Sequence, residues 1–344
     1  MLFTAPLLSH IFPCLNAVTP NRQVQALNAM GIAASLEGDH ILAEIPENRA
    51  DLSCLEGLGR TVSAVLGIKF DSLHSLVPGS ENGSIYESVD LEVPSEACLR
   101  LSAAMATDCN VGPSPEWIKD ILNTCGITPV NNFNDIAALV TLETGIPLLI
   151  LDRSTLPEGS LIVRDAFPGE KIHLPDETII TLDAGVPLFS DENCQSLFPA
   201  GTQDTDISAS CREILILAGV YDPCILRSLG KVLPHTIRNF KRNCLALDPM
   251  QTIPALNRAC YLIFSLSCGK ILDGILDNLN YVPQSVILPF SESVSSKTKD
   301  FLRTLGFVFR ENGLEIPSYR KDILSQKDLQ LEMDRIETAI SSIH

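Results

Sequence analysis

The middle of the chain mixes short strand-like runs with helical segments, and this order constrains the fold more than any other feature. The strand-like runs are Leu161–Val163, Ile179–Leu182 and Ile214–Leu217. Helical patterns cover Asn134–Glu143, 224–232 and 254–267. Such a mixed order is typical of an α+β fold rather than of a regular strand–helix repeat. We therefore predict a mixed α/β domain over residues 90–280.

The clearest single helix is predicted for the segment PSPEWIKDILNTCG, residues 113–126. Ser114 is expected at the N-cap, where its hydroxyl can accept a hydrogen bond from a first-turn N–H group. Pro115 suits the first helical position, which needs no N–H group. Gly126 can adopt the left-handed conformation that ends a helix.

Each end of the chain predicts a smaller unit. In residues 1–80, apolar side chains at helical spacing predict a helix that ends at Gly67. The polar stretch 78–95 is expected to be a loop between units. Residues 281–344 predict a strand, a helix, a hairpin with a type I′ turn at Asn312-Gly313 and a last helix. This order is similar in shape to a winged helix. The fold class is therefore α+β, with three domains.

Charge and composition exclude several classes of function. The chain has 344 residues and a net charge of −17, which opposes a broad nucleic-acid-binding face. We expect no DNA partner, and tRNA only at a local basic patch. None of the eleven cysteines forms a C-x-x-C pair, so they are expected to be buried thiols in a reducing cytoplasm. The longest apolar stretch, Ile136–Leu151, contains Glu143 and is too short to cross a membrane.

Four stretches resemble the β subunit of phenylalanyl-tRNA synthetase, in that family's order. The most specific is residues 111–152, VGPSPEWIKDILNTCGITPVNNFNDIAALVTLETGIPLLILD, which is similar to the opening of the editing domain. The others are NRADLSCLEGLGRTVSAVLG at 48–67, the YDP and LDP triplets at 221–223 and 247–249, and IPSYRKDI with DLQLEMDR at 316–323 and 328–335. The resemblance implies an N-terminal, an editing-type and a winged-helix-like domain.

The departures from the family pattern matter for function. Only a few residues separate Leu36 from Ile45, where the family inserts an oligonucleotide-binding fold. The family's synthetase core and anticodon-binding domain are not expected here, so the chain alone is not expected to aminoacylate tRNA. Leu149 stands where the family has a histidine, and Leu217 where it has the glutamate that recognises tyrosine's hydroxyl. Loss of such a hydrogen bond removes discrimination of about 10⁴-fold or more. The resemblance therefore implies a degenerate editing pocket and no catalytic residue.

Three polar residues of the same pocket leave two interpretations open. Asn131, Asn132 and Asp135 match the family's N-N-x-x-D run. They can cap a helix, with Asn132 or Asn134 at the N-cap and Asp135 in the first turn. The alternative is that they line a ligand pocket.

Three acidic residues resemble a magnesium site of the family. Asp322, Asp328 and Glu332 match three of its four acidic positions, and Leu331 replaces the fourth. Because magnesium often takes few protein carboxylates, three could suffice. Asp328 also stands where a helix begins, which is a capping position. The sequence itself predicts no cofactor, and magnesium enters on the resemblance alone.

One basic cluster is dense enough to contact RNA. Arg238, Lys241 and Arg242 are spaced to lie on one helical face, with Phe240 between them. Contact with phosphate is one interpretation. The other is a solvated face that balances nearby acidic residues.

Two functions remain after these observations. The first is a catalytically inert module that binds RNA or a protein partner, which the leucines at 149 and 217 and the negative charge favour. The second is a trans-editing hydrolase for misacylated tRNA, which the long match over 111–152 favours. An editing enzyme predicts polar groups around Leu149 and Leu217, whereas a binding module predicts an apolar or filled pocket.

Overall fold

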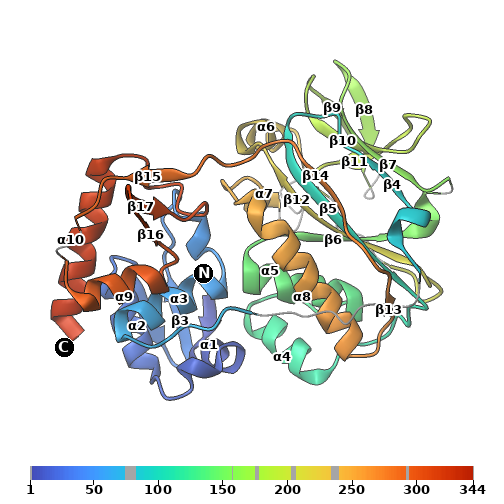
Figure 1. The fold of residues 1–344 in the computed structure, drawn as a ribbon. Coiled ribbons are helices and arrows are strands. Elements are labelled where there is room, and N and C mark those ends of the chain that lie inside the picture. Colours follow the sequence, from blue (N-terminus) through green and yellow to red (C-terminus); the bar gives the residue numbers. More distant parts are fainter. Residues whose placement is uncertain are drawn as a thin grey trace.

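The chain forms two lobes that lie side by side (Figure 1). The computed structural model describes residues 2–73, 83–156, 158–174, 178–202, 207–233, 240–291 and 294–343. The first lobe contains both ends of the chain, and the second contains its middle. No helix in these described ranges is long and apolar enough to cross a membrane.

The N-terminal part of the first lobe is a three-stranded antiparallel sheet with three helices. The strands run in the order β1-β3-β2, and the elements are β1 (Leu2–Thr4), α1 (Ala5–Ile11), α2 (Pro20–Ala29), β2 (Ala34–Glu37), β3 (His40–Ala43) and α3 (Leu55–Leu66). Glu37 pairs with His40, so only two residues join β2 to β3. Gly38, with φ of +62°, makes this tight turn. Gly38 and Asp39 are thus the whole connection between the two strands.

Helix α3 follows the predicted pattern. Its apolar positions Leu58, Val62 and Val65 are buried, and Gly67 ends it with φ of +65°. The N-cap is Cys54, whose sulfur accepts a hydrogen bond from the N–H of Gly57. The backbone packs closely around the first turn of α3, because a Cβ atom on Gly57 would lie 1.8 Å from a backbone oxygen.

The C-terminal part of the first lobe confirms the predicted order of strand, helix, hairpin and helix. Its elements are β15 (Val286–Leu288), α9 (Ser296–Thr304), β16 (Val308–Arg310), β17 (Gly313–Ile316) and α10 (Gln326–Ile343). The predicted type I′ turn is wrong. Arg310 pairs with Gly313, and Asn312 between them does not have the positive φ that type I′ requires.

The two ends of the chain share one core. Helix α10 packs on α2, α3 and α9, so the last helix covers the first sheet-and-helix unit (Figure 1). Phe12 and Leu58 near the N-terminus and Leu302 and Ile336 near the C-terminus belong to one buried apolar cluster, which continues into the helical face of the second lobe. The sequence indicated two separate end units, whereas they form a single lobe.

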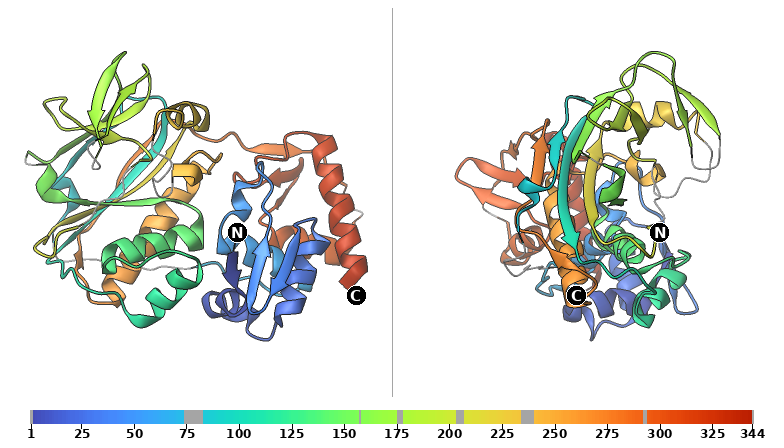
Figure 2. Two further views of the ribbon diagram at one scale, coloured as in Figure 1. Left: turned by 180° about the vertical axis from the view of Figure 1, so that it is seen from behind. Right: turned by 90° about the vertical axis from the view of Figure 1, so that its right-hand side faces the viewer.

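The second lobe consists of two sheets, a hairpin and helices. The larger sheet has the order β13-β5-β12-β6, with β14 also paired to β5; the smaller has the order β11-β10-β7-β4. Their strands are β4 (Asp90–Glu92), β5 (Cys98–Thr107), β6 (Leu148–Asp152), β7 (Ser160–Asp165), β10 (Pro187–Ser190), β11 (Ser196–Pro199), β12 (Ile214–Tyr221), β13 (Lys270–Ile271) and β14 (Leu276–Leu279). The β8–β9 hairpin (Glu170–His173, Ile179–Leu182) projects from the far end (Figure 2). The presence of β4 corrects part of the loop predicted over 78–95.

Helices cover one face of the larger sheet. They are α4 (Glu116–Thr124), α5 (Asn132–Thr144) and α8 (Thr252–Ser265), while α6 (Pro223–Leu229) and α7 (Phe240–Asn243) lie at its end. Along β12, Ile214 and Ile216 belong to the core on the helical face, and Leu215 and Leu217 to the core on the other. Both faces of this strand are thus buried, which explains its continuous apolar run.

Helix α4 forms where predicted, but its predicted N-cap is wrong. Pro115 takes the N-cap position without a side-chain hydrogen bond. The hydroxyl of Ser114 instead donates to the carboxylate of Asp135, at 2.5 Å. Gly126 has the expected left-handed conformation, with φ of +72°.

Candidate functional site

Leu149 and Leu217 lie side by side at the centre of the candidate pocket. They are register partners on the antiparallel strands β6 and β12. Leu217 is 1% exposed, and both side chains join the apolar core between the two sheets. Their neighbours in this core include Leu151 and Leu215. Within the described residues, apolar side chains therefore surround the two positions that distinguish this chain from the family pattern.

The polar residues of the predicted pocket hold the start of α5. Asn131 is the N-cap, and its side-chain oxygen accepts hydrogen bonds from the N–H groups of Phe133 and Asn134. Asn132 donates to the carbonyl of Asn110, and its side-chain oxygen accepts from the N–H of Gly112. The expectation of an N-cap at Asn132 or Asn134 is therefore wrong by at least one residue.

Asp135 completes this network from the first turn of α5. One carboxylate oxygen accepts from the N–H of Val130 at 2.8 Å, and the other accepts from Ser114. Asp135 is 2% exposed. These hydrogen bonds fix the loop before α5. Both carboxylate oxygens are engaged and buried, so they are poorly placed to contact a ligand.

The five residues predicted to share one pocket lie in two places. Asn131, Asn132 and Asp135 begin α5, on the helical face of the larger sheet. Leu149 and Leu217 point to the opposite face, toward the smaller sheet. Because side chains alternate along a strand, a residue at 149 cannot face α5 without a change of register.

Removing the cap of α5 is expected to destabilise the chain. Asn131→Ala leaves two N–H groups in a buried helix start without their acceptor, so we expect a loss of about 1–2 kcal/mol. Asn123→Ala, at an exposed position of α4, should change stability by less than about 0.5 kcal/mol. Urea unfolding of both variants checks this difference, and equal losses would contradict the capping role.

The two described residues of the basic cluster, Lys241 and Arg242, differ in their exposure. Lys241 is exposed, while Arg242 is half-buried and donates hydrogen bonds to the carbonyl and hydroxyl of Ser53. Burial lowers the pKa of Arg242. Arg238 lies outside the described residues. Arg242 thus connects the second lobe to the first, and RNA contact at Lys241 and Arg238 stays a prediction.

The three acidic residues of the C-terminal part are already engaged by other side chains. Arg320, 1% exposed, donates two hydrogen bonds of 2.9 Å to Asp322 and one of 2.9 Å to Glu332. Asp328 accepts from the hydroxyl of Ser325 at 2.7 Å, at the start of α10. The expected N-cap at Asp328 is wrong by three residues, because Ser325 precedes α10 and its hydroxyl accepts from the N–H of Asp328, which lies in the first turn.

The electrostatics of this cluster are those of a buried ion pair. Burial alone would raise the pKa of Asp322, but the hydrogen bonds and charge of Arg320 hold it below its ordinary value. Burial alone would likewise lower the pKa of Arg320, yet Asp322 and Glu332 raise it. In the described part of the chain, no group of three His, Cys, Asp or Glu side chains is arranged to hold a metal ion. The residues therefore do not fit a magnesium site, because Arg320 supplies the positive charge between the carboxylates.

This arrangement predicts how the chain responds to magnesium. We expect neither millimolar magnesium nor EDTA to shift the melting temperature, because a ligand stabilises a protein only if it binds the folded state. A magnesium-dependent rise in the melting temperature would contradict this and support the site implied by the resemblance. Calcium serves as the control for a general effect of divalent ions.

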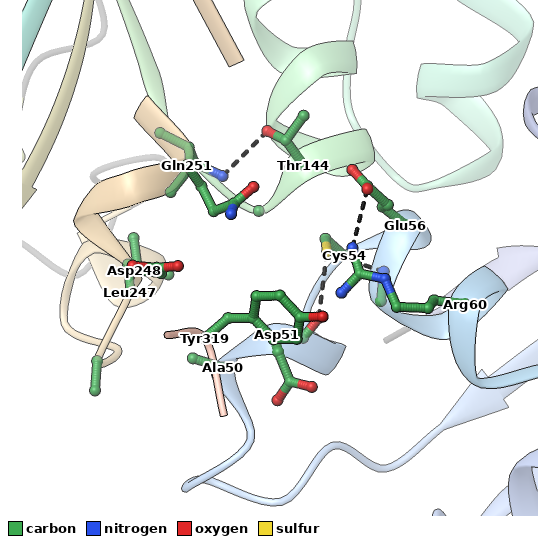
Figure 3. Close-up of a pocket in the computed structure, with 14 residues that line it drawn as sticks. Ala50, Asp51, Cys54, Glu56, Arg60, Thr144, Leu247, Asp248, Gln251 and Tyr319 are labelled. Atoms are coloured by element: carbon green, nitrogen blue, oxygen red, sulfur yellow. Dashed lines mark hydrogen bonds and ion pairs between the residues drawn. The ribbon is translucent and has the colours of Figure 1, made fainter. Parts of the chain in front are cut away.

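A small cavity lies where the two lobes meet (Figure 3). Asp51, Cys54 and Arg60 reach it from the first lobe, and Thr144 and Gln251 from the second. It holds about 40 Å³ of space for water-sized occupants, enough for a few water molecules and too little for an amino acid. Burial raises the pKa of Cys54 to about 11, so its thiol is a poor nucleophile at neutral pH. The cavity is part of the lobe contact rather than a catalytic site.

Comparisons with known proteins identify a domain family and several relatives of this chain. Residues 97–268 match the B3/4 domain family. The chain is 28% identical over 309 residues to the "Phenylalanine--tRNA ligase beta subunit" of Clostridium acetobutylicum, covering 85% of this chain and 39% of that protein. The subunit of the same name from Anaeromyxobacter dehalogenans is 29% identical over 332 residues, covering 88% of this chain and 40% of the relative. The chain thus spans about two fifths of the length of these relatives.

A solved N-terminal fragment of the phenylalanyl-tRNA synthetase β subunit from Pyrococcus horikoshii covers 99% of both chains, with 12% identity and a TM-score of 0.49. The family match spans residues 97–268, which is half of the chain, and the two curated relatives carry the resemblance through both lobes. The chain belongs to the B3/4 domain family and is similar to phenylalanine–tRNA ligase β subunits.

Proposed function

We propose that this chain is a catalytically inert relative of the synthetase β subunit that serves as a binding module for RNA or for a protein partner. The observation that carries the proposal is the pairing of Leu149, which is partly buried, with Leu217, which is fully buried, across β6 and β12. Editing of a misattached amino acid requires polar groups that recognise its hydroxyl and hold the attacking water. Two apolar leucine side chains supply neither.

The relatives are named as subunits of an aminoacyl-tRNA ligase, and we propose that this chain shares their origin but not their activity. The chain spans about two fifths of those proteins, so we do not extend their aminoacylation to it. A tRNA and another protein subunit are the partners that the relationship suggests, and the cytoplasm is the corresponding compartment. The net charge of −17 restricts RNA contact to local sites and favours a protein partner.

A trans-editing hydrolase is the second candidate. The match of residues 97–268 to the B3/4 domain supports it, because the resemblance assigns the editing-type domain to this part of the chain. Because Leu149 and Leu217 have no polar side-chain groups, this function would need other residues to hold the ester.

Single-turnover deacylation separates the two functions. With the protein in excess over tyrosyl-tRNA specific for phenylalanine, we expect the ester to disappear at the spontaneous rate. A phenylalanine–tRNA ligase that keeps the histidine and glutamate of the family motif is the positive control. Hydrolysis about tenfold above the spontaneous rate, equivalent to about 1.4 kcal/mol of transition-state stabilisation, would overturn the inert-module proposal.

A further inference from the structure

The largest of the three described cavities is a cleft between the two lobes, and it is lined by more cations than acids. Its volume is about 680 Å³, within the range of small-molecule sites, which often lie between domains. Arg60, Lys69 and Arg303 line it, and Glu56 is its acidic residue. In a chain of net charge −17, a cleft wall with an excess of cations departs from the average surface.

The cleft is built by elements from both lobes. Arg60 belongs to α3, Lys69 follows α3, and Arg303 is near the end of α9, all in the first lobe (Figure 1). Pro254, from the start of α8, closes it on the side of the second lobe. A second hollow of about 490 Å³ shares Lys69 and Arg303 with the cleft, so the same two cations line both spaces.

Two of the three cations are free to change partners. Lys69 is 3.7 Å from Asp71, and Arg303 is 3.0 Å from Asp300, but these side chains are all at least 60% exposed. Exposed pairs of this kind are weak, and neither aspartate lines the cleft. A ligand with more negative charge than one carboxylate can therefore replace them.

The third cation is fixed. Arg60 is held by Glu56 at 3.0 Å and stacks over the ring of Tyr319, 4.6 Å from its centroid. Its guanidinium has no other hydrogen-bond partner among the described residues. The cleft thus combines one preoriented guanidinium with two exposed cations, of which Arg303 also lies over the ring of Phe309 at 5.3 Å. Phe70 and Leu73 add an apolar wall.

We propose that this cleft binds a small phosphate-bearing molecule of about mononucleotide size. Guanidinium and ammonium groups favour phosphate oxygens, and the apolar wall accommodates an uncharged part of the ligand. The chain's overall negative field disfavours a long polyanion, because such a ligand extends beyond the cations, whereas a compact anion contacts them directly. The proposal goes beyond the binding-module function and does not depend on whether the chain hydrolyses an ester.

Calorimetric titration of the whole chain with pyrophosphate and with adenosine monophosphate tests the proposal. We expect saturable binding that Lys69→Ala and Arg303→Ala each weaken about tenfold or more, the effect of losing one charge-assisted hydrogen bond. Lys299→Ala is the matched control, since Lys299 lies on α9 but does not line the cleft. Unchanged melting temperatures show that the variants fold.

A second pair of variants should act in the opposite direction. Asp71→Asn and Asp300→Asn remove the carboxylates that compete for the two cations, so binding should tighten. Asp120→Asn, on α4 in the other lobe, makes the same change in net charge and should have little effect. No binding of either probe, or equal effects in the control variants, would overturn the proposal. Binding of tRNA or of polyglutamate through Lys69 and Arg303 without binding of the small phosphates would also overturn it.

Discussion

Replacing Arg320 by alanine is expected to cost about 3–5 kcal/mol of folding free energy at neutral pH. The substitution removes the cation shared by Asp322 and Glu332, which are 8% and 1% exposed, and leaves them only the longer contacts to Arg49 at 3.8 Å and Arg335 at 3.4 Å. Breaking a buried ion pair on one side costs this much because the remaining charges stay buried. Urea unfolding measures the loss, and Arg310→Ala is the control. Arg310 pairs with Glu315 on the same unit but is 54% exposed, so its loss should cost less than about 1 kcal/mol.

The pH dependence of this effect has a defined sign. Arg320 holds the pKa of Asp322 below its ordinary value, so this pair stabilises the fold above the usual carboxylate range. That contribution is lost as the pH falls through the lowered pKa. The difference between wild type and Arg320→Ala should therefore be full at pH 7 and shrink in acid. A difference that grows in acid, or a neutral-pH cost below about 1 kcal/mol, would contradict the buried pair.

Leu217→Glu is expected to have the second largest effect, and it tests the apolar pocket directly. The introduced carboxylate would lie between the two sheets among apolar side chains, where burial costs several kcal/mol, so we expect a loss of at least about 3 kcal/mol at pH 7. Burial should raise the pKa of this carboxylate, so the loss is greatest above that pKa and decreases as the pH falls. Unfolding at pH 7 and pH 5 measures both effects.

Leu217→Met is the matched control for this variant. Methionine fills a similar volume without a charge, so its cost should stay below about 1.5 kcal/mol. If Leu217→Glu were as stable as wild type at pH 7, polar groups would have to surround this position. That outcome would support the trans-editing alternative over the inert module.

The regular elements were largely predictable because their signals are local. Apolar spacing and Gly67 define α3, and the β-type run at Ile179–Leu182 coincides with β9. One error fell where a distant partner competes for a capping group. Ser114 has the right chemistry for an N-cap, but the carboxylate of Asp135, 21 residues away, accepts its hydroxyl instead.

The candidate site was predictable in its composition but not in its geometry. Leu149 and Leu217 were identified by position, and they are indeed partners on adjacent strands. The sequence alone could not show that Asn131 lies on the opposite face of the larger sheet from these two leucines. Arg320 had no sequence signal as the partner of two carboxylates, because its role depends on a helix that begins six residues later.

The sequence by itself determined several of the helices and strands, the family resemblance and the loss of polar groups at positions 149 and 217. These follow from residue types and short-range spacing, which act within a few turns of helix or a single strand. The tertiary structure alone decided that both ends of the chain form one lobe, that Arg320 lies between the acidic residues, and that three cations meet in the cleft between lobes. Those contacts join residues far apart in the chain, and burial and charge pairing between distant segments select them.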